Sequence, residues 1–166
     1  MDPVVRMAST ADIPMLERDV RGVWGGSFET DLEQQDAGLH SCFIAVVDSE
    51  ILGSGFIRWA GPRDPEASRL FPAAPEIYRL AVKEERRSQG IGTLLIAAME
   101  QDAQGKGYRS VSLGVGHENP RAYSLYKRLG FADTTLTEYY DEYFYPTPDG
   151  KTAKARDLCR YLVKNF

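Results

Sequence analysis

Cysteine and histidine are scarce in this sequence, which has two of each among 166 residues. Cys42 and Cys159 lie far apart in apolar surroundings, and neither belongs to a CxxC pair. We interpret both as small core residues rather than as partners in a disulfide. Because only His40 and His117 could join them, the sequence predicts no metal site.

Positive charge and long apolar runs are also in short supply. The longest apolar run, Leu94–Met99, falls far short of the roughly 20 residues that cross a bilayer. Residues Met1–Arg6 lack the apolar segment of a secretory signal. A formal net charge of −4 and an isoelectric point of about 5.3 disfavour general binding to nucleic acid or an anionic membrane. We therefore expect a cytoplasmic protein without such partners, and the length fits one domain over residues 1–166.

Apolar periodicity and turn residues predict an alternation of strands and helices. The expected strands are Val4–Met7, Cys42–Asp48, Ile51–Trp59, Glu76–Val82, Val111–Val115, Ala132–Tyr145 and Ala155–Val163. The expected helices are Asp12–Val23, Asp31–Gly38, Ile91–Gln104 and Pro120–Leu129. Four prolines interrupt Ala60–Pro75, which we interpret as a long loop with one helical turn at Glu66–Leu70. The order predicts an α/β (α+β) fold, a mixed sheet of about seven strands with helices on both faces.

The segment Arg86–Thr93 follows a strand and opens a helix. Gly90 and Gly92 let the backbone turn tightly and approach a ligand closely. Backbone N–H groups at a helix start have no partner within the helix, so they can bind a pyrophosphate. The segment is neither a P-loop nor a dinucleotide fingerprint, because the lysine of the first and the third glycine of the second are absent. Taken alone, it also suits a turn that binds nothing.

Two motifs around this segment resemble the hallmarks of the GNAT N-acetyltransferase superfamily. Arg87–Gly92 is similar to the family signature (Arg/Gln)-x-x-Gly-x-(Gly/Ala), and the preceding Leu80–Val82 resembles the strand before it. Asn119–Phe131 (N-x-x-A-x-x-L-Y-x-x-x-G-F) resembles the second hallmark. Both occur in the family's order within Glu76–Phe131, with a helix and a strand between them.

The resemblance implies where the donor substrate binds. In this family the fourth and fifth strands are parallel and splay apart, and acetyl-coenzyme A (acetyl-CoA) enters the split with its pantetheine arm along the fourth strand. The residues that the resemblance places against acetyl-CoA are Leu80, Ala81, Val82, Arg87, Ser88, Gln89, Gly90, Ile91, Gly92, Thr93, Asn119 and Tyr126.

The resemblance also implies the reaction, in which a primary amine attacks the thioester directly in a ternary complex. It gives the Leu80 N–H the role of oxyanion donor, and Tyr126 that of the acid that protonates the leaving thiolate. Glu76 is the candidate general base, and an exposed charge at a strand start is the alternative. Members that act on protein amino termini often carry a glutamate on the fifth strand, where this sequence has Gly114.

The acceptor is harder to predict. His117 lies just past the fifth strand, where a solvated loop residue is favoured over a proton shuttle. Aromatic residues within Tyr139–Tyr145 suit either sheet packing or a substrate wall, and with Trp24, Phe28 and Trp59 they favour a small amine. A protein amino terminus or lysine is the alternative acceptor. An acyl-CoA sensor without turnover and a nucleotide-binding protein are the alternatives of other classes. A homodimer rests on analogy with the family.

Overall fold

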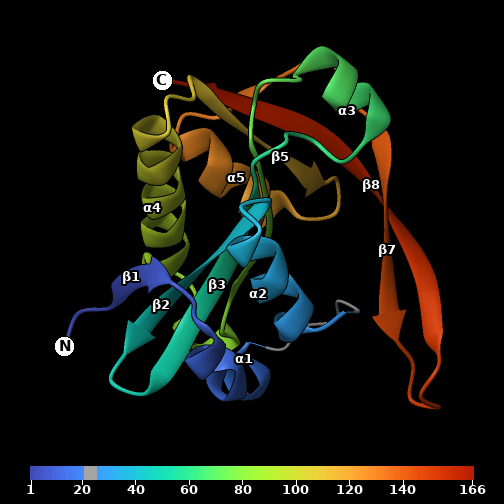
Figure 1. Ribbon diagram of the computed structural model, residues 1–166. Coiled ribbons are helices and arrows are strands. Elements are labelled where there is room, and N and C mark those ends of the chain that lie inside the picture. Colours follow the sequence, from blue (N-terminus) through green and yellow to red (C-terminus); the bar gives the residue numbers. More distant parts are fainter. Residues whose placement is uncertain (21–25) are drawn as a thin grey trace.

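The computed structural model describes residues 1–20 and 26–166, and its described strands form one curved mixed sheet (Figure 1). The strands are β1 (Val4–Met7), β2 (His40–Val47), β3 (Glu50–Arg58), β4 (Glu76–Val82), β5 (Ser110–Gly116), β6 (Ala132–Asp133), β7 (Tyr139–Pro146) and β8 (Thr152–Asn165). The helices are α1 (Ile13–Asp19), α2 (Phe28–Asp36), α3 (Pro65–Leu70), α4 (Ile91–Gly105) and α5 (Pro120–Arg128). The strand order is β1-β2-β3-β4-β5-β8-β6, with β7 also paired to β8.

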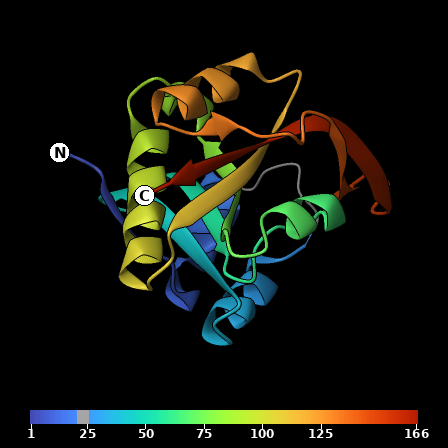
Figure 2. The ribbon, with the colours of Figure 1, turned by 90° about the horizontal axis from the view of Figure 1, so that it is seen from above.

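Both faces of the sheet carry helices, as predicted (Figure 2). Alternate strand residues point to opposite faces, so Phe43 and Ala45 pack towards α4 while Cys42 and Ile44 pack towards α1 and α2. Cys42 and Cys159 are both free and buried, which confirms their interpretation as core residues. None of the described helices is both long and apolar enough to cross a membrane.

The amino-terminal helices differ from prediction at their ends. A 3-10 turn at Thr10–Asp12 precedes α1, and α1 ends at Asp19. Val20 is the C-cap of α1, and the end of the expected helix (residues 21–23), like Trp24 after it, lies outside the described residues. Helix α2 begins at Phe28 rather than Asp31, because the Ser27 hydroxyl accepts a bond from the Thr30 N–H at 3.2 Å.

The expected strand Ala132–Tyr145 is wrong, because the structure divides it into β6 and β7. Thr134 causes the interruption. Its hydroxyl donates to the Tyr161 carbonyl at 2.8 Å and accepts from the Leu136 N–H at 3.1 Å, which turns the backbone away from the ladder. The second part, β7, forms a long two-stranded ribbon with β8 that stands away from the body in Figure 1.

The proline-rich connection contains the expected helical turn as α3. The Asp64 carboxylate caps it by accepting from the N–H groups of Glu66 and Ala67, both at 3.0 Å. Ala67 is fully buried against Tyr161 of β8, so α3 covers the sheet beside β7. This leaves the middle of the same face, over β4 and β5, between α2 on one side and the ribbon on the other.

Strands β4 and β5 are parallel and separate along their length, as predicted. Their described ladder consists of one pair, Glu76 with Ser112, at the start of β4. The Ser112 N–H also bonds to the Pro75 carbonyl at 2.9 Å, which holds this end of the two strands together. From there to Val82, β4 is paired only with β3 among the described strands. The β5-facing edge of β4 therefore has backbone groups free to bind a ligand.

Candidate active site

A pocket of about 670 Å³ opens at the end of β4, between the loop that begins α4 and helix α5. It is lined by Leu80, Ala81, Val82, Arg86, Arg87, Ser88, Gly90, Ile91, Gly92, Thr93, Asn119, Arg121, Ala122, Ser124, Leu125, Tyr126 and Arg128. Every residue predicted to contact acetyl-CoA is in this set except Gln89, whose amide donates to the Glu85 carbonyl at 3.2 Å instead.

The start of α4 presents backbone donors to this pocket. Gly90 is the N-cap with a left-handed φ of 82°, and no side chain of the described residues caps the helix. The N–H of Leu94 bonds to the Gly90 carbonyl at 3.0 Å, so the N–H groups of Ile91 and Gly92 precede the first helical bond. Their direction and the positive end of the helix dipole favour an anionic group.

The charge of the pocket has one sign. Four arginines line it (Arg86, Arg87, Arg121 and Arg128), and no Asp or Glu is among its described lining residues. Arg121 donates to the Ser88 hydroxyl at 2.6 Å, and the Arg87 Nε donates to the Val82 carbonyl at 3.3 Å. In a chain of net charge −4, this concentration of arginine and backbone N–H groups suits a ligand with several phosphates.

Tyr126 of α5 also lines the pocket. Its side chain is 8% exposed and packs edge-on against Phe131 with ring centroids 5.9 Å apart. Burial raises the pKa of its hydroxyl to about 12, so the phenol stays protonated at neutral pH. Among the described residues, none accepts a hydrogen bond from this hydroxyl. Asn119 also lines the pocket while its side chain caps α5 by accepting from the Ala122 N–H at 3.2 Å.

A β-bulge shapes β4 just before the pocket. Phe56 pairs with Tyr78 and Ser54 pairs with Ala81, so Arg79 and Leu80 both face the single residue between them on β3. Arg79 has a left-handed φ of 51°, a strained conformation for a residue other than glycine. Asp31 of α2 holds the guanidinium at 3.0 Å, and the same group lies 4.3 Å above the Phe56 ring.

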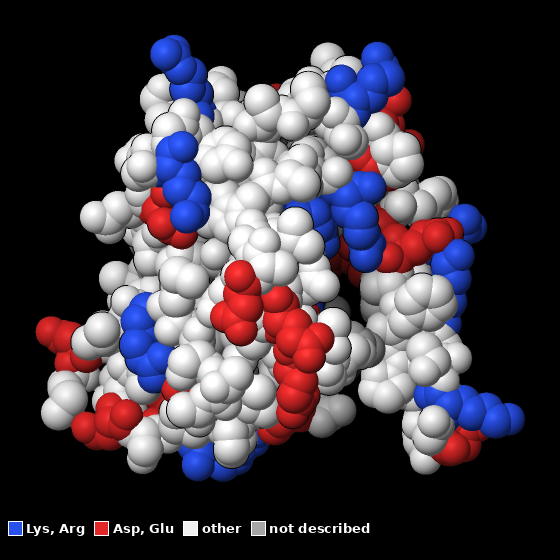
Figure 3. All heavy atoms as spheres, viewed as in Figure 1, with Lys and Arg blue, Asp and Glu red and all other residues white. Residues whose placement is uncertain are grey.

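A second cavity, of about 700 Å³, lies on the opposite face of the sheet between α2, β4 and the β7–β8 ribbon. Figure 3 shows the surface hollowed beside the free end of the ribbon, with side chains of both signs above the hollow. Its lining includes His40, Arg58, Glu76, Tyr78, Gly114, Tyr139, Asp141, Tyr143, Phe144 and Asp157. The two cavities thus meet the split between β4 and β5 from its two sides.

Glu76 is buried in this second cavity, with 8% of its surface exposed. Its Oε1 accepts from the Arg58 guanidinium and from the Arg63 N–H, and its Oε2 accepts from the Tyr161 hydroxyl at 2.8 Å. Desolvation raises the pKa of the carboxyl, and the Tyr161 hydrogen bond and Arg58 oppose that rise. The Tyr161 hydroxyl is also 2.9 Å from that of Ser112, so Glu76 belongs to a network that spans β3, β4, β5 and β8.

The cavity contains polar residues around Glu76 that the sequence did not assign to the site. His40 of β2 and Arg58 of β3 lie in register with Glu76 of β4. The His40 Nδ1 bonds with the Tyr78 hydroxyl, and burial followed by the nearby Arg58 lowers the pKa of the imidazole. Only the strand register brings these residues together, so strand patterning alone could not reveal them.

The aromatic residues expected around the acceptor are divided by the structure. Tyr139, Tyr143 and Phe144 line the second cavity, whereas Tyr140 and Tyr145 do not. Phe28 belongs to the core under α1 and α2, and Trp59 stacks on Tyr108 with ring centroids 5.6 Å apart. These last two residues therefore form no acceptor wall.

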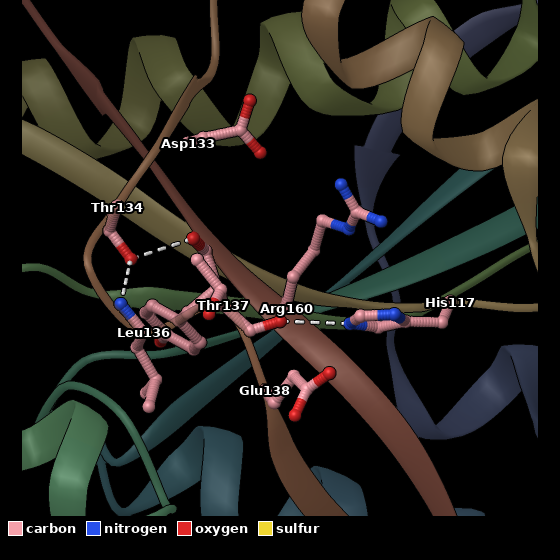
Figure 4. A pocket seen from close by; sticks show the side chains of 8 residues that line it. His117, Asp133, Thr134, Leu136, Thr137, Glu138 and Arg160 are labelled. Carbon is pink, nitrogen blue, oxygen red and sulfur yellow. Dashed lines mark hydrogen bonds between the residues drawn. The ribbon is translucent and has the colours of Figure 1, made fainter.

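His117 lies beside neither of the two large cavities. It lines a smaller one of about 210 Å³ with Thr137, Glu138 and Arg160 (Figure 4). Its Nε2 is 2.8 Å from the Thr137 carbonyl, which ties the loop after β5 to the segment before β7. The contact gives His117 a structural partner away from the split.

Comparison with known sequences decides the family. Residues 12–131 match the profile of the acetyltransferase (GNAT) family. The chain belongs to this family. The match spans both motifs and the whole of β4, α4, β5 and α5, and it confirms the resemblance of the two motifs to the GNAT hallmarks. Acetyl-CoA is the acyl donor of GNAT acetyltransferases.

Individual relatives within the GNAT family share part of the chain. The [ribosomal protein bS18]-alanine N-acetyltransferase of Escherichia coli is 31% identical over 75 residues, 45% of this chain and 48% of that protein. The mycothiol acetyltransferase of Cellulomonas flavigena is 30% identical over 117 residues, 70% of this chain and 32% of that protein. The matches to curated relatives such as these span about a quarter to just over half of the relatives' own lengths.

Solved GNAT structures agree with the fold. The crystal structure of the ribosomal-protein-S18-alanine N-acetyltransferase from E. coli has a TM-score of 0.66 at 18% identity, covering 98% of this chain and 93% of that one. A GNAT acetyltransferase from Elizabethkingia anophelis with acetyl-CoA bound has a TM-score of 0.61 at 18% identity, covering 99% of each chain.

Proposed function

We propose that this protein is an N-acetyltransferase that transfers the acetyl group of acetyl-CoA to a primary amine by direct attack in a ternary complex. The observation that carries the proposal is the pocket of about 670 Å³ at the end of β4, where four arginines and the free N–H groups of α4 meet. A sensor without turnover would need no second cavity on the other side of the split.

The donor would bind in that pocket. The pantetheine arm would lie along the unpaired edge of Leu80–Val82, and the pyrophosphate would bind the loop from Arg87 to Thr93. Acetyl-CoA binding would displace the Arg87 side chain from the Val82 carbonyl, which it contacts at 3.3 Å. The bulge at Arg79 leaves Leu80 without a partner of its own in the β3 register, which supports the role of its N–H as oxyanion donor.

The chemistry would require two proton transfers. The amine nitrogen attacks the thioester carbonyl carbon, so that a C–N bond forms and the C–S bond breaks. The proton lost by the amine passes to Glu76, directly or through water, because burial raises the pKa of this carboxyl and so makes it a stronger base. The thiolate of coenzyme A takes the proton of the Tyr126 hydroxyl, which has no other partner among the described residues.

A small amine is the acceptor we favour, because the cavity of about 700 Å³ is walled by α2, β4 and the ribbon. A protein amino terminus is the second candidate. It is favoured by the alanine N-acetyltransferases among the relatives. It is also favoured by the hollow beside the free end of the ribbon, which is open to solvent and could admit a peptide.

The test measures binding and turnover with the purified protein. Thermal unfolding is followed with acetyl-CoA, ATP and NAD, because a ligand at 100 times its Kd stabilises the folded state by about 2.7 kcal/mol. Thiol release from acetyl-CoA is then measured with spermidine, L-lysine and a hexapeptide that begins with alanine. We expect stabilisation by acetyl-CoA alone and thiol release with at least one amine.

The outcomes separate the alternatives. Stabilisation by acetyl-CoA without thiol release would point to a sensor, and stabilisation by ATP or NAD alone would refute the donor assignment. A Glu76→Gln variant that keeps the pH–rate profile of the wild type would remove Glu76 as the base.

A further inference from the structure

Tyr139 reaches across the sheet to β5. It begins β7, where it pairs with Cys159 of β8, and β8 in turn pairs with β5. Its ring lies edge-on to Tyr161, with centroids 5.8 Å apart. Because neighbouring strands are about 4.8 Å apart, a tyrosine that lies over β8 can place its hydroxyl on the strand beyond.

The hydroxyl of Tyr139 lies where β5 has no side chain. A Cβ built at Gly114 would overlap the Tyr139 oxygen and come within 3.1 Å of its Cζ. Gly114 is thus the residue that makes room for this hydroxyl. A Cβ added at Gly116, two residues further on the same face of β5, would meet no atom within 4 Å.

This hydroxyl has no hydrogen-bond partner among the described residues, although it lines the second cavity together with Glu76 and Gly114. Burial, with the nearby Cys159 and the carboxylates of Asp141 and Glu76, raises the pKa of the phenol. It therefore stays protonated and can both donate and accept a hydrogen bond. It lies on the opposite side of the split from Tyr126.

We propose that Tyr139 is an acceptor-binding residue. Its hydroxyl, which occupies the space left by the missing side chain of Gly114, holds the amine at the split. The inference rests on the proposed function and adds a specific residue to its acceptor side. The hydroxyl accepts a hydrogen bond from the amine N–H and thereby directs the nitrogen lone pair at the thioester. No covalent bond to Tyr139 forms or breaks.

The chain offers matched variants for the test. Tyr139→Phe removes the hydroxyl and keeps the ring, whereas Tyr140→Phe removes an exposed hydroxyl from the next residue of the same strand. Gly114→Ala fills the space of the hydroxyl, whereas Gly116→Ala adds the same methyl group in open space. The variants are assayed with whichever of the three amines (spermidine, L-lysine or the alanine hexapeptide) the wild type turns over fastest.

We expect Tyr139→Phe to lower kcat/KM for the amine about tenfold, the usual scale of one lost hydrogen bond. The KM for acetyl-CoA should stay unchanged, and Tyr140→Phe should change neither constant. Gly114→Ala should lose at least as much kcat/KM as Tyr139→Phe, with no loss for Gly116→Ala. In a Tyr139→Ala background, Gly114→Ala should cost less, because the overlap is gone.

Two results would overturn the inference. One is a Tyr139→Phe variant with the amine kcat/KM of Tyr140→Phe. The other is a Gly114→Ala substitution that lowers kcat/KM and the free energy of unfolding in urea by the same amounts in the wild type and in the Tyr139→Ala background. Both leave the wild-type activity intact, so they differ from a wild type that releases no thiol with any amine, which would refute the proposed function itself.

Discussion

Gly90 offers a direct test of how the backbone shapes the donor pocket. Its φ of 82° lies in the left-handed region, and a Cβ added there would meet nothing within 4 Å. The cost of Gly90→Ala is therefore backbone strain alone, about 1–2 kcal/mol for an L-residue. Since about 2–4 °C of Tm accompanies each kcal/mol in a chain of this size, Tm should fall by about 2–8 °C.

Gly105, at the other end of α4, provides a control in which the same substitution should raise rather than lower the free energy of unfolding. It is the last residue of α4, its φ is not positive, and an added Cβ also meets nothing within 4 Å. Gly105→Ala should therefore stabilise the protein by about 0.4–1 kcal/mol, because alanine has less freedom to lose on folding.

The assay combines urea unfolding with the KM for acetyl-CoA. Relaxation of the left-handed turn by Gly90→Ala should move the N–H groups of Ile91 and Gly92, so the KM for acetyl-CoA should rise while Gly105→Ala leaves it unchanged. Equal stability and equal KM in the two variants would refute the view that the Gly90 conformation organises the pocket.

Three further substitutions test the polar groups at the split. Tyr126→Phe should lower kcat by about 10²-fold or more and keep acetyl-CoA affinity, measured by thiol release and calorimetry, because only a proton donor is lost; unchanged kcat would contradict the acid role. Tyr161→Phe should cost about 1–3 kcal/mol in urea unfolding, because Glu76 Oε2 loses its buried donor. The folded pKa of Glu76 is raised above its ordinary 4.5, so its contribution to stability is fully present below pH 4.5 and is lost as pH rises through the folded value. Glu76→Gln should flatten that part of the stability–pH curve, and an unchanged slope would count against the raised pKa.

The local structure of the proposed donor site could be predicted because its residues are consecutive. Arg87–Gly92 and Asn119–Phe131 each carry a complete local pattern, a turn or cap followed by a helical stripe. The structure keeps those boundaries, since α4 begins at Ile91 and α5 at Pro120. Gln89 was predicted to contact acetyl-CoA but does not line the pocket, because a sequence motif does not specify the direction of an individual loop side chain.

The remaining site could not be predicted, because it depends on strand register over long separations. The Tyr161 hydroxyl meets Glu76 only because β8 aligns with β5 and β5 with the start of β4. The alternation of apolar residues predicted those strands, but it did not predict which strands pair or in which register. The division of Ala132–Tyr145 into β6 and β7 also escaped prediction, since it follows from the bond of Thr134 to the Tyr161 carbonyl.

The proposed donor site depends on local backbone structure, whereas the proposed acceptor site depends on side chains from several strands. This difference would allow the acceptor to change between members of the fold while the donor stays the same. In the proposed site, donor binding would use backbone groups of β4 and α4, which few substitutions can alter without breaking the elements themselves. The proposed acceptor cavity is built from side chains, and much of its wall comes from the β7–β8 ribbon, whose outer part pairs with no other described strand. Substitutions at Tyr143 or Asp157 there change the cavity without disturbing the sheet core. We therefore expect the ribbon, rather than either GNAT motif, to determine which amine the protein accepts.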